Sequence, residues 1–371
     1  MIYADNAATT QLAPEALEAM MPFLTTEYGN ASQPYSFARS AKQALKNSRE
    51  IIAKCINALP EEIVFTSGGT EGDNWCIKEI MLNSERGSEL ITSEIEHHAI
   101  LNSSTYLEKK GYSLTLLPVD STGRINPANL RNAISDNTKL VSIMFSNNEV
   151  GSIQPIKDLA QISHKNNALF HTDAVQAVGH VKVDVRDLGV DFLTTSAHKF
   201  NGPKGVGFIY IKKGINLTSH TNGGSQEFGL RAGTENIPSI VGMATAFKIN
   251  CDKLEANSKY LTCLEEELIK HLDAFNLDYR RNGSDIHIPG NVSLSFRGYE
   301  GEMILHRLDL MGICVSTGSA CDSKNTQISH VLRAMQVPKE YAVGTIRISL
   351  GMNNTVEDVR RIAVALRKII K

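Results

Sequence analysis

Short apolar runs rich in β-branched residues alternate, up to about residue 211, with longer segments whose apolar positions recur every three to four residues. The runs are typical of strands buried on both faces, and the longer segments have the period of amphipathic helices. A helix is predicted over residues 41–58, where one face carries Ala44, Ile51, Ile52, Cys55 and Ile56. Strands are predicted at residues 63–66, 90–93, 114–118, 140–145, 169–172, 192–195 and 206–211. This alternation predicts an α/β fold with a mainly parallel, doubly wound sheet.

The pattern changes after about residue 240, where helices and strands no longer alternate regularly. The elements predicted there are a helix over 253–275, a strand over 291–296, a helix over 300–310, a strand over 345–350 and a final helix over 356–370, capped by Asn354 or Thr355. Such a mixture is typical of a smaller α+β domain. We expect residues 15–250 to form a large domain, and residues 1–14 and 251–371 to form the small one.

The composition is that of an ordinary globular chain and narrows the classes of partner. Of 371 residues, 42% are hydrophobic, and 38 Lys and Arg oppose 40 Asp and Glu, which excludes disordered and collagen-like chains. No basic block is present that would bind a nucleic acid backbone or an anionic membrane. The six cysteines lack any CxxC spacing, as is typical of a reducing compartment. Neither a targeting peptide nor a membrane span is recognisable, so we expect a cytoplasmic protein that binds small molecules or proteins.

Four of the seven predicted strands are followed by polar clusters, at the edge of the sheet where open α/β folds bind ligands. The first cluster, residues 66–74 (TSGGTEGDN), opens a predicted helix over residues 75–81. Its glycines allow a close backbone approach, its hydroxyls donate hydrogen bonds, and a helix N-terminus attracts an anion, so it could cradle a phosphate. It matches neither GxxxxGK[ST] nor GxGxxG, and a Gly-rich turn that caps a helix explains it equally well.

Two further clusters offer histidines and a carboxylate. Residues 94–98 (EIEHH) place His97 beside His98; surface histidines are the simpler interpretation than a metal site, unless a ring-shaped ligand needs a stacking or proton-transfer partner. Residues 171–176 (HTDAVQ) place Asp173 at the end of an apolar strand, with Gln176 three residues on. Asp173 could cap the next helix, or it could pair with a cationic ring nitrogen.

The most specific cluster is residues 194–207 (TTSAHKFNGPKGVG), between two predicted strands. It places Lys199 on a short turn, after Ser196 and His198 and before several glycines. Lysine normally lies on solvated surfaces, whereas a lysine that forms a Schiff base needs a rigid setting and a lowered pKa. A lysine for an aldehyde, Asp173 for a pyridinium nitrogen and a phosphate cradle together describe a site for pyridoxal 5′-phosphate (PLP).

Five segments resemble the cysteine desulfurases, in family order, and the likeness extends from residues 5–9 (DNAAT) to Arg347. The segments are residues 66–74, 146–151 (SNNEVG), 196–205 (SAHKFNGPKG), 231–236 (RAGTEN) and 316–321 (STGSAC). The last of them is similar to the NifS/IscS branch of the aspartate-aminotransferase-like superfamily, PLP fold type I. The resemblance implies a large PLP-binding domain with a seven-stranded sheet, and a small domain that carries a catalytic-cysteine loop and Arg347.

The resemblance also implies a role for each cofactor-binding residue. Lys199 would carry PLP and then remove the substrate Cα proton as general base. Asp173 would keep the pyridine nitrogen protonated, Gln176 would hydrogen-bond the ring hydroxyl, and His97 would stack on the ring and shuttle protons. The implied phosphate ligands are Thr70, Ser196 and His198, with Gly69 allowing close approach and Thr234 reaching the phosphate of the other subunit in a homodimer. No metal site is expected.

The implied substrate is L-cysteine, which the enzyme would convert to L-alanine. Arg347 would clamp the substrate carboxylate with help from Asn148. The alternative from the residues alone is a structural ion pair of Arg347 on a half-buried strand. Cys321 would attack the substrate sulfur and hold it as a persulfide. The expected acceptors are proteins such as an iron–sulfur scaffold or a sulfur-relay protein, on routes to iron–sulfur clusters, thiolated tRNA or sulfur-containing cofactors.

Other functions stay open on the sequence alone. Another PLP enzyme, such as a selenocysteine lyase or an aminotransferase, would share most of this site, although transamination needs no thiol at Cys321. A sulfur-relay protein without catalysis would have no need of Lys199. A nicotinamide dehydrogenase is disfavoured because no GxGxxG follows the first strand. Three positions depart from the family pattern, which has His, Gly and often Arg where this chain has Tyr35, Ala38 and Phe228.

Overall fold

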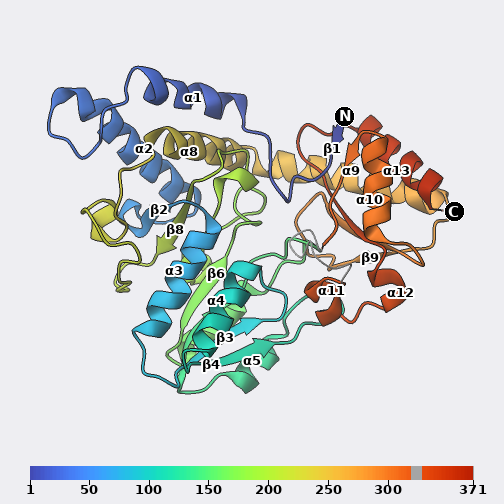
Figure 1. The fold of residues 1–371 in the computed structure, drawn as a ribbon, viewed down its shortest axis with the longest axis horizontal. Coiled ribbons are helices and arrows are strands. Elements are labelled where there is room, and N and C mark those ends of the chain that lie inside the picture. The colour runs from blue at the N-terminus through green and yellow to red at the C-terminus, as the bar shows by residue number, and fades with distance from the viewer. Residues whose placement is uncertain (319–327, 371) are drawn as a thin grey trace.

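The computed structural model describes residues 1–318 and 328–370, which form two lobes joined by consecutive helices (Figure 1). Within these residues the larger lobe contains a seven-stranded sheet, and the smaller lobe contains a three-stranded and a two-stranded sheet. Helix α8 (Ile237–Asp252) packs in the larger lobe, and α9 (Leu254–Ala274) continues from it into the smaller one. In the described part of the chain, no helix is both long enough and apolar enough to cross a bilayer.

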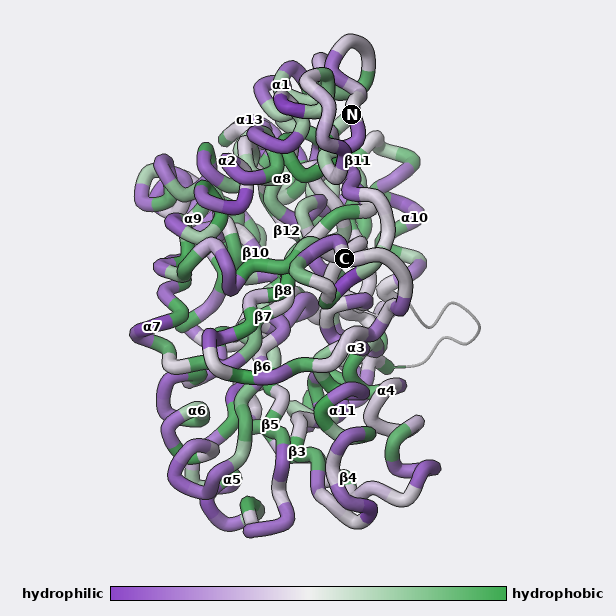
Figure 2. Tube along the Cα trace, turned by 90° about the vertical axis from the view of Figure 1, so that its left-hand side faces the viewer, coloured by the Kyte–Doolittle hydropathy of each residue, from purple (hydrophilic) through white to green (hydrophobic). Residues whose placement is uncertain are grey.

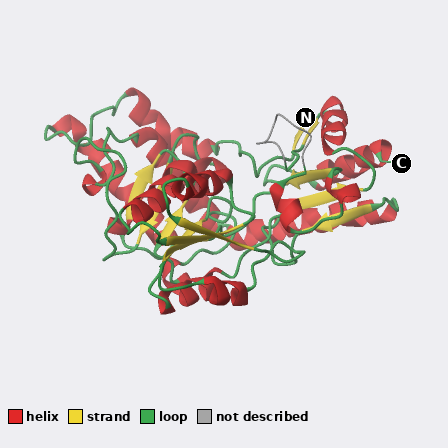
Figure 3. Cartoon of the chain, turned by 60° about the horizontal axis from the view of Figure 1, so that its bottom comes forward, coloured by secondary structure: helices red, strands yellow, loops and turns green. Residues whose placement is uncertain are grey.

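The seven predicted strands are confirmed and form one sheet, with shifts of a few residues at their ends. The strand order is β2-β8-β7-β6-β5-β3-β4, and only β8 runs antiparallel to its neighbours within this sheet. Hydrophobic positions run along β7 and β8 (Figure 2), and helices cover both faces (Figure 3), which explains the unbroken apolar runs. The bounds are β2 (Ile63–Thr66), β3 (Glu89–Ser93), β4 (Ser113–Leu117), β5 (Thr138–Ser142), β6 (Leu169–Asp173), β7 (Phe192–Thr194) and β8 (Gly207–Ile211).

Two helix boundaries differ from the prediction. Helix α2 (Arg39–Cys55) ends before residue 58 because Asn57 takes a left-handed φ of 59°. Helix α3 (Gly69–Leu82) begins at Gly69 and not at residue 75. Glycine disfavours helix, but here it allows the first turn to rest on β7, since a Cβ on Gly72 would lie 2.7 Å from the side chain of Thr194. The other helices of this lobe are α1 (Pro14–Thr25), α4 (His98–Glu108), α5 (Pro127–Ala133), α6 (Ile156–Lys165) and α7 (Val185–Leu188).

The smaller lobe has its own hydrophobic core, and the predicted elements of this region are confirmed. Its antiparallel sheet has the order β12-β10-β9, and a parallel pair joins β1 to β11. The final helix is capped by the side chain of Thr355, which accepts a hydrogen bond from the Asp358 backbone N–H. The division of the domains at residues 15 and 250 stays a prediction. The bounds are β1 (Ile2–Tyr3), β9 (Tyr279–Asn282), β10 (Asn291–Phe296), β11 (Ile313–Cys314), β12 (Thr345–Ser349), α10 (Gly301–Leu310), α11 (His330–Ala334), α12 (Lys339–Ala342) and α13 (Val356–Ile369).

Candidate active site

A cavity of about 400 Å³ lies where the large sheet meets the smaller lobe. It is lined by residues from the ends of β6 and β7, from the first turn of α3, from β12 and from the N-terminal segment. Ten residues predicted from the sequence line it: Gly69, Thr70, His97, Asn148, Asp173, Gln176, Ser196, His198, Lys199 and Arg347. The cavity therefore unites the polar clusters that follow separate strands.

Lys199 ends a short 3₁₀ turn (Ala197–Lys199) between β7 and β8. Its Nζ donates hydrogen bonds to the backbone carbonyls of Ala7 and Ala8, both at 2.8 Å. The Gln176 side chain also reaches this segment, since its Nε2 donates to the Ala7 carbonyl at 3.0 Å. The N-terminal segment thus covers the lysine turn and supplies acceptors that hold the amine inside the cavity.

Asp173 is the last residue of β6 and its carboxylate is buried at the cavity. One oxygen accepts a hydrogen bond from the Val175 backbone N–H at 2.9 Å in the turn that follows the strand. The predicted helix cap is wrong, because the next helix, α7, begins only at Val185 and is capped by Asp184. Burial raises the pKa of Asp173, while the nearby charges of His97 and Lys199 act in the opposite direction. A cation placed against this carboxylate would stabilise its ionised form.

Beneath Asp173 lies a second buried carboxyl group, Asp73 of helix α3. Burial, and then the charge of Asp173, raise the pKa of Asp73 well above its usual range, and its Oδ1 accepts a hydrogen bond from the Thr194 hydroxyl. The neighbouring His171 is 3.7 Å from Asp73, and burial lowers the pKa of His171 to about 3. His171 is therefore neutral near pH 7, and the raised pKa of Asp73 favours the protonated form of that carboxyl group. Asp73 was not predicted as a site residue, although it stands within residues 66–74.

His97 is the N-cap of α4, and its Nδ1 accepts a hydrogen bond from the Ala99 backbone N–H at 3.2 Å. This bond assigns the hydrogen of the neutral ring to Nε2. Burial lowers the pKa of His97, so the neutral ring prevails near pH 7. His98 does not line the cavity; its ring packs against that of His330, with centroids 5.0 Å apart. The two adjacent histidines therefore lie in different surroundings, and only His97, for which the resemblance implies a role, lines the cavity.

Two of the predicted phosphate ligands, Thr70 and Ser196, lie at the N-terminus of α3, and the third, His198, lines the same cavity. Thr70 lies in the first turn of this helix, and Ser196 faces Gly68, where an added Cβ would lie 3.2 Å from the serine hydroxyl oxygen. His198 is 3.1 Å from the Thr9 hydroxyl through Nδ1, and burial together with nearby lysines lowers the pKa of His198 to about 4. Gly69 proves necessary for packing, because a Cβ there would lie 2.5 Å from Val175. Hydroxyls beside a helix N-terminus are well suited to hold an anion.

Arg347 projects from β12 and is only 6% exposed. One terminal nitrogen donates to Asp5 at 2.7 Å, and the other donates to the backbone carbonyl of Asn148 at 2.9 Å. Its buried Nε has no hydrogen-bond partner among residues 1–318 and 328–370. The structural ion pair considered from the sequence is thus present, yet the guanidinium lines the cavity and keeps an unused donor. Neither the pairing with Asp5 nor the contact through the backbone of Asn148 was predicted from the sequence.

Two predicted residues are not among the lining of this cavity. Thr234 is exposed and lines a separate cavity of about 190 Å³; its loop is held to α3 by an ion pair between Arg231 and Glu71 at 2.9 Å. Cys321 lies outside the described residues. Phe228 is one of the three departures from the family pattern. Its ring packs against Arg49, whose guanidinium carbon lies 4.9 Å from the centre of the ring.

Comparison with known proteins agrees with this geometry. The sequence matches the aminotransferase class-V family over residues 2–362. It is 47% identical to the cysteine desulfurase IscS of Clostridium botulinum (strain Hall / ATCC 3502 / NCTC 13319 / Type A) over 374 residues, which cover 100% of this chain and 94% of that protein. A solved NifS-like protein has a TM-score of 0.94 at 38% identity, covering 99% of this chain and 98% of its own. Another solved structure, SspA in complex with cysteine, has a TM-score of 0.85 at 33% identity. The match covers 96% of this chain and 100% of the SspA chain.

Proposed function

The chain belongs to the aminotransferase class-V family and is a cysteine desulfurase, and from this premise we propose that its cavity holds PLP and L-cysteine and that Cys321 receives the sulfur. The observation that carries the proposal is the meeting of ten predicted residues in one cavity. They come from both lobes and include a lysine, a buried carboxylate and an arginine. These are the groups that an aldehyde cofactor, its ring nitrogen and an amino acid carboxylate require.

The residues present fit PLP in charge and in hydrogen-bonding capacity. Asp173 is a buried carboxylate in need of a cation, which a protonated pyridine nitrogen supplies. Thr70 and Ser196 stand at the N-terminus of α3, where a phosphate is stabilised. Lys199 would hold the cofactor through Nζ, and Gln176 and His97 line the same space. When bound, PLP supplies an electron sink for the charge that develops at the substrate Cα.

The protein's own part in the reaction is to position the substrate and to move protons. Lys199 Nζ is proposed as the base that takes the Cα proton. The carbonyls of Ala7 and Ala8 hold this nitrogen in the cavity. At His97, Nδ1 is occupied by the helix cap, so Nε2 is the nitrogen left to give and take a proton. Both groups lie against the charge of Asp173, which attracts their cationic forms.

Arg347 is proposed to bind the substrate carboxylate, and Arg347→Lys is expected to raise KM for cysteine about 10- to 100-fold, with kcat changed far less. The reason is that lysine offers a point charge in place of a fork of donors, which removes one charge-assisted hydrogen bond. Steady-state kinetics measure the split between KM and kcat. The matched control is Arg361→Lys on the exposed side of α13, which should leave both constants unchanged. An unchanged KM in Arg347→Lys would remove Arg347 from the substrate site.

Cys321 is proposed to take the sulfur from the substrate. Its thiolate attacks the cysteine sulfur, an S–S bond forms, the Cβ–S bond breaks, and the carbon keeps the electron pair and is protonated to the methyl group of alanine. Cys321→Ala is expected to lower release of sulfide and alanine from cysteine by at least about 100-fold. Both products are measured with a reductant present, and Cys263→Ala, which removes an exposed thiol, serves as control. Sulfide release at the wild-type rate in Cys321→Ala would contradict the assignment, and release without alanine would contradict desulfuration itself.

A homodimer is proposed because α1 and the segment after it expose apolar side chains in an unusual number. The exposed fractions lie between 46% and 71% for Leu17, Met21, Leu24, Tyr28, Tyr35 and Phe37. An exposed cluster of this kind is typical of an interaction surface. In a two-fold assembly Thr234, which is exposed and outside the active-site cavity, would reach the phosphate in the other subunit.

The shared-site arrangement predicts complementation. Thr234→Ala is expected to weaken PLP binding about tenfold, because one hydrogen bond to a charged oxygen is lost. A heterodimer of a Thr234→Ala chain with a Lys199→Ala chain should then contain one site with wild-type affinity for PLP, since that site combines the intact lysine of one chain with the intact threonine of the other. Titration of the heterodimer with PLP distinguishes the shared site from a site in which Thr234 binds the phosphate of its own chain. In that second case neither site of the heterodimer has wild-type affinity for PLP.

The route of the sulfur onward is proposed to lead to protein acceptors of the iron–sulfur scaffold or sulfur-relay kind. The likeness to a cysteine desulfurase named IscS favours iron–sulfur cluster assembly. A persulfide must form on a free thiol and be released again, so the chemistry belongs in a reducing compartment such as the cytoplasm.

A further inference from the structure

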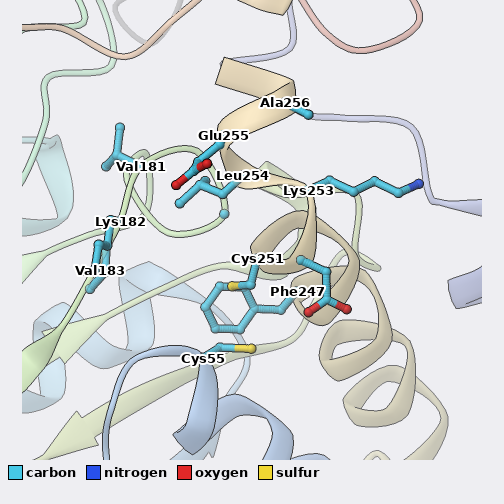
Figure 4. Close-up of a pocket in the computed structure, with 12 residues that line it drawn as sticks. Cys55, Val181, Lys182, Val183, Phe247, Cys251, Lys253, Leu254, Glu255 and Ala256 are labelled. Carbon is cyan, nitrogen blue, oxygen red and sulfur yellow. The ribbon is translucent and has the colours of Figure 1, made fainter. Parts of the chain in front are cut away.

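A second cavity, of about 530 Å³, lies where the end of α2 meets the junction of α8 and α9. It shares none of its lining residues with the active-site cavity. Figure 4 shows that two of the side chains around it carry sulfur: Cys55, the last residue of α2, and Cys251, next to the last residue of α8. The proposed reaction uses neither thiol.

The two thiols are in contact. Each thiol shifts the pKa of the other, neither is in a disulfide, and both are partly exposed at the cavity. In Figure 4 Cys251 lies directly above Cys55, with the ring of Phe247 beside them. The sequence placed Cys55 on the apolar face of a predicted helix. Its proximity to Cys251 could not be predicted, because a pairing between two distant helices has no local spacing to reveal it.

The rest of the cavity wall offers charges of both signs next to apolar surface. Lys182 and Lys253 are cationic, Asp252 and Glu255 are anionic, and the remaining side chains include Val181, Val183, Phe247 and Leu254. Outside the wall, Lys248 pairs with Asp252. A small molecule that carries ammonium and carboxylate groups could pair with both signs while its middle lies against the apolar side chains.

We propose that Cys55 and Cys251 form a second, redox-active thiol site, which is oxidised to an intrachain disulfide by exchange with a small zwitterionic disulfide of the amino acid class bound in this cavity. The site is independent of the proposed desulfuration. Its chemistry is thiol–disulfide exchange, in which the bound disulfide is the oxidant.

The exchange balances in two steps. Cys55 Sγ attacks one sulfur of the small disulfide, the S–S bond breaks, and the first half leaves as a thiol with the proton that Cys55 gave up. Cys251 Sγ then attacks the Cys55 sulfur, and the second half leaves as a thiol with the proton of Cys251. Two protein thiols are oxidised, and one disulfide is reduced to two thiols.

The local contacts favour Cys55 as the first nucleophile. The hydrogen bond from Cys251 lowers the pKa of Cys55, and the positive charges of Lys248 and Lys54 act in the same direction. The same hydrogen bond, together with burial, raises the pKa of Cys251, so Cys251 keeps its proton until the mixed disulfide has formed. The product would tie the ends of α2 and α8 together beside the start of α9, which connects the two lobes.

The test exposes the folded, full-length wild-type chain to L-cystine without oxygen, alkylates the remaining thiols and maps the peptides by mass spectrometry. The expected product is a crosslink between the peptides that contain Cys55 and Cys251, with loss of two hydrogens. Cystamine, which has only the amines, and dithiodiglycolate, which has only the carboxylates, should react more slowly than cystine. A crosslink that forms only in unfolded chain overturns the proposal, and equal rates with all three disulfides overturn the recognition of a zwitterion.

Variants separate the two steps. In Cys251→Ser the reaction is expected to stop at the mixed disulfide between Cys55 and one cysteine half of cystine. In Cys55→Ser, Cys251 is expected to stay unmodified. Cys263→Ser, which removes an exposed thiol elsewhere, should form the crosslink at the wild-type rate. Circular dichroism confirms that each variant is folded, and the wild-type map decides the question even where a variant is not. Modification of Cys251 in Cys55→Ser at the rate seen for Cys55 in Cys251→Ser would overturn the order of attack.

Discussion

Lys199→Ala is expected to lower the rate of alanine formation from cysteine by about 10⁴-fold and to remove the visible absorbance band of bound PLP. The lysine is proposed both to hold the cofactor and to take the Cα proton, and a positioned base alone contributes up to about 10⁴-fold. No other lysine lines the cavity among the described residues. Rates are measured with saturating PLP and cysteine, and the absorbance spectrum is recorded on the same samples.

The matched control for this variant is Lys204→Ala. Lys204 lies on the same turn between β7 and β8, but its side chain is exposed and outside the cavity. Its loss should leave the absorbance band in place and change the rate by less than about threefold, as for a surface charge. If Lys199→Ala kept the absorbance band and the wild-type rate, Lys199 would have no part in the site.

The large sheet could be predicted because its strands obey a local rule. A strand covered by helices on both faces must be apolar at every position, and runs such as residues 206–211 stand out for that reason. The position of Lys199 could be predicted for the same reason, because the turn that carries it lies between two such runs. Helix starts were less certain, since α3 begins in a glycine-rich segment that only contact with β7 makes helical.

What the sequence could not reveal are the contacts between distant segments. Asp5 meets Arg347 only because β1 pairs with β11, which carries the N-terminal segment across the mouth of the cavity. The pKa of Asp73 is raised by burial and then by the charge of Asp173, a residue on another element. The contact of Cys55 with Cys251 likewise depends on the packing of α2 against α8. In each case the residue type was visible in the sequence, and its partner was not.

The two buried carboxyl groups lead to the second large prediction. Asp173→Asn is expected to lower kcat about 10³-fold, because the variant loses the charge that holds a protonated ring nitrogen. A pair of opposite charges about 4 Å apart at an effective dielectric constant of about 20 gains about 4 kcal/mol, which corresponds to about 10³ in rate. The amide keeps the shape of the side chain and leaves an oxygen to accept the hydrogen bond from Val175, so the loss reports the charge.

Asp73→Asn is the matched control for Asp173→Asn. Asp73 is as deeply buried and is also a carboxyl group at the cavity, but burial and the charge of Asp173 raise its pKa well above the usual range, which favours its neutral form. An amide mimics the neutral form that burial favours and still accepts the hydrogen bond from Thr194, so kcat should fall by less than about tenfold. Steady-state kinetics and the visible absorbance of both variants, measured side by side, decide the matter. Equal losses in the two variants would mean that the site depends on buried carboxyl groups for structure, and not on the single negative charge of Asp173.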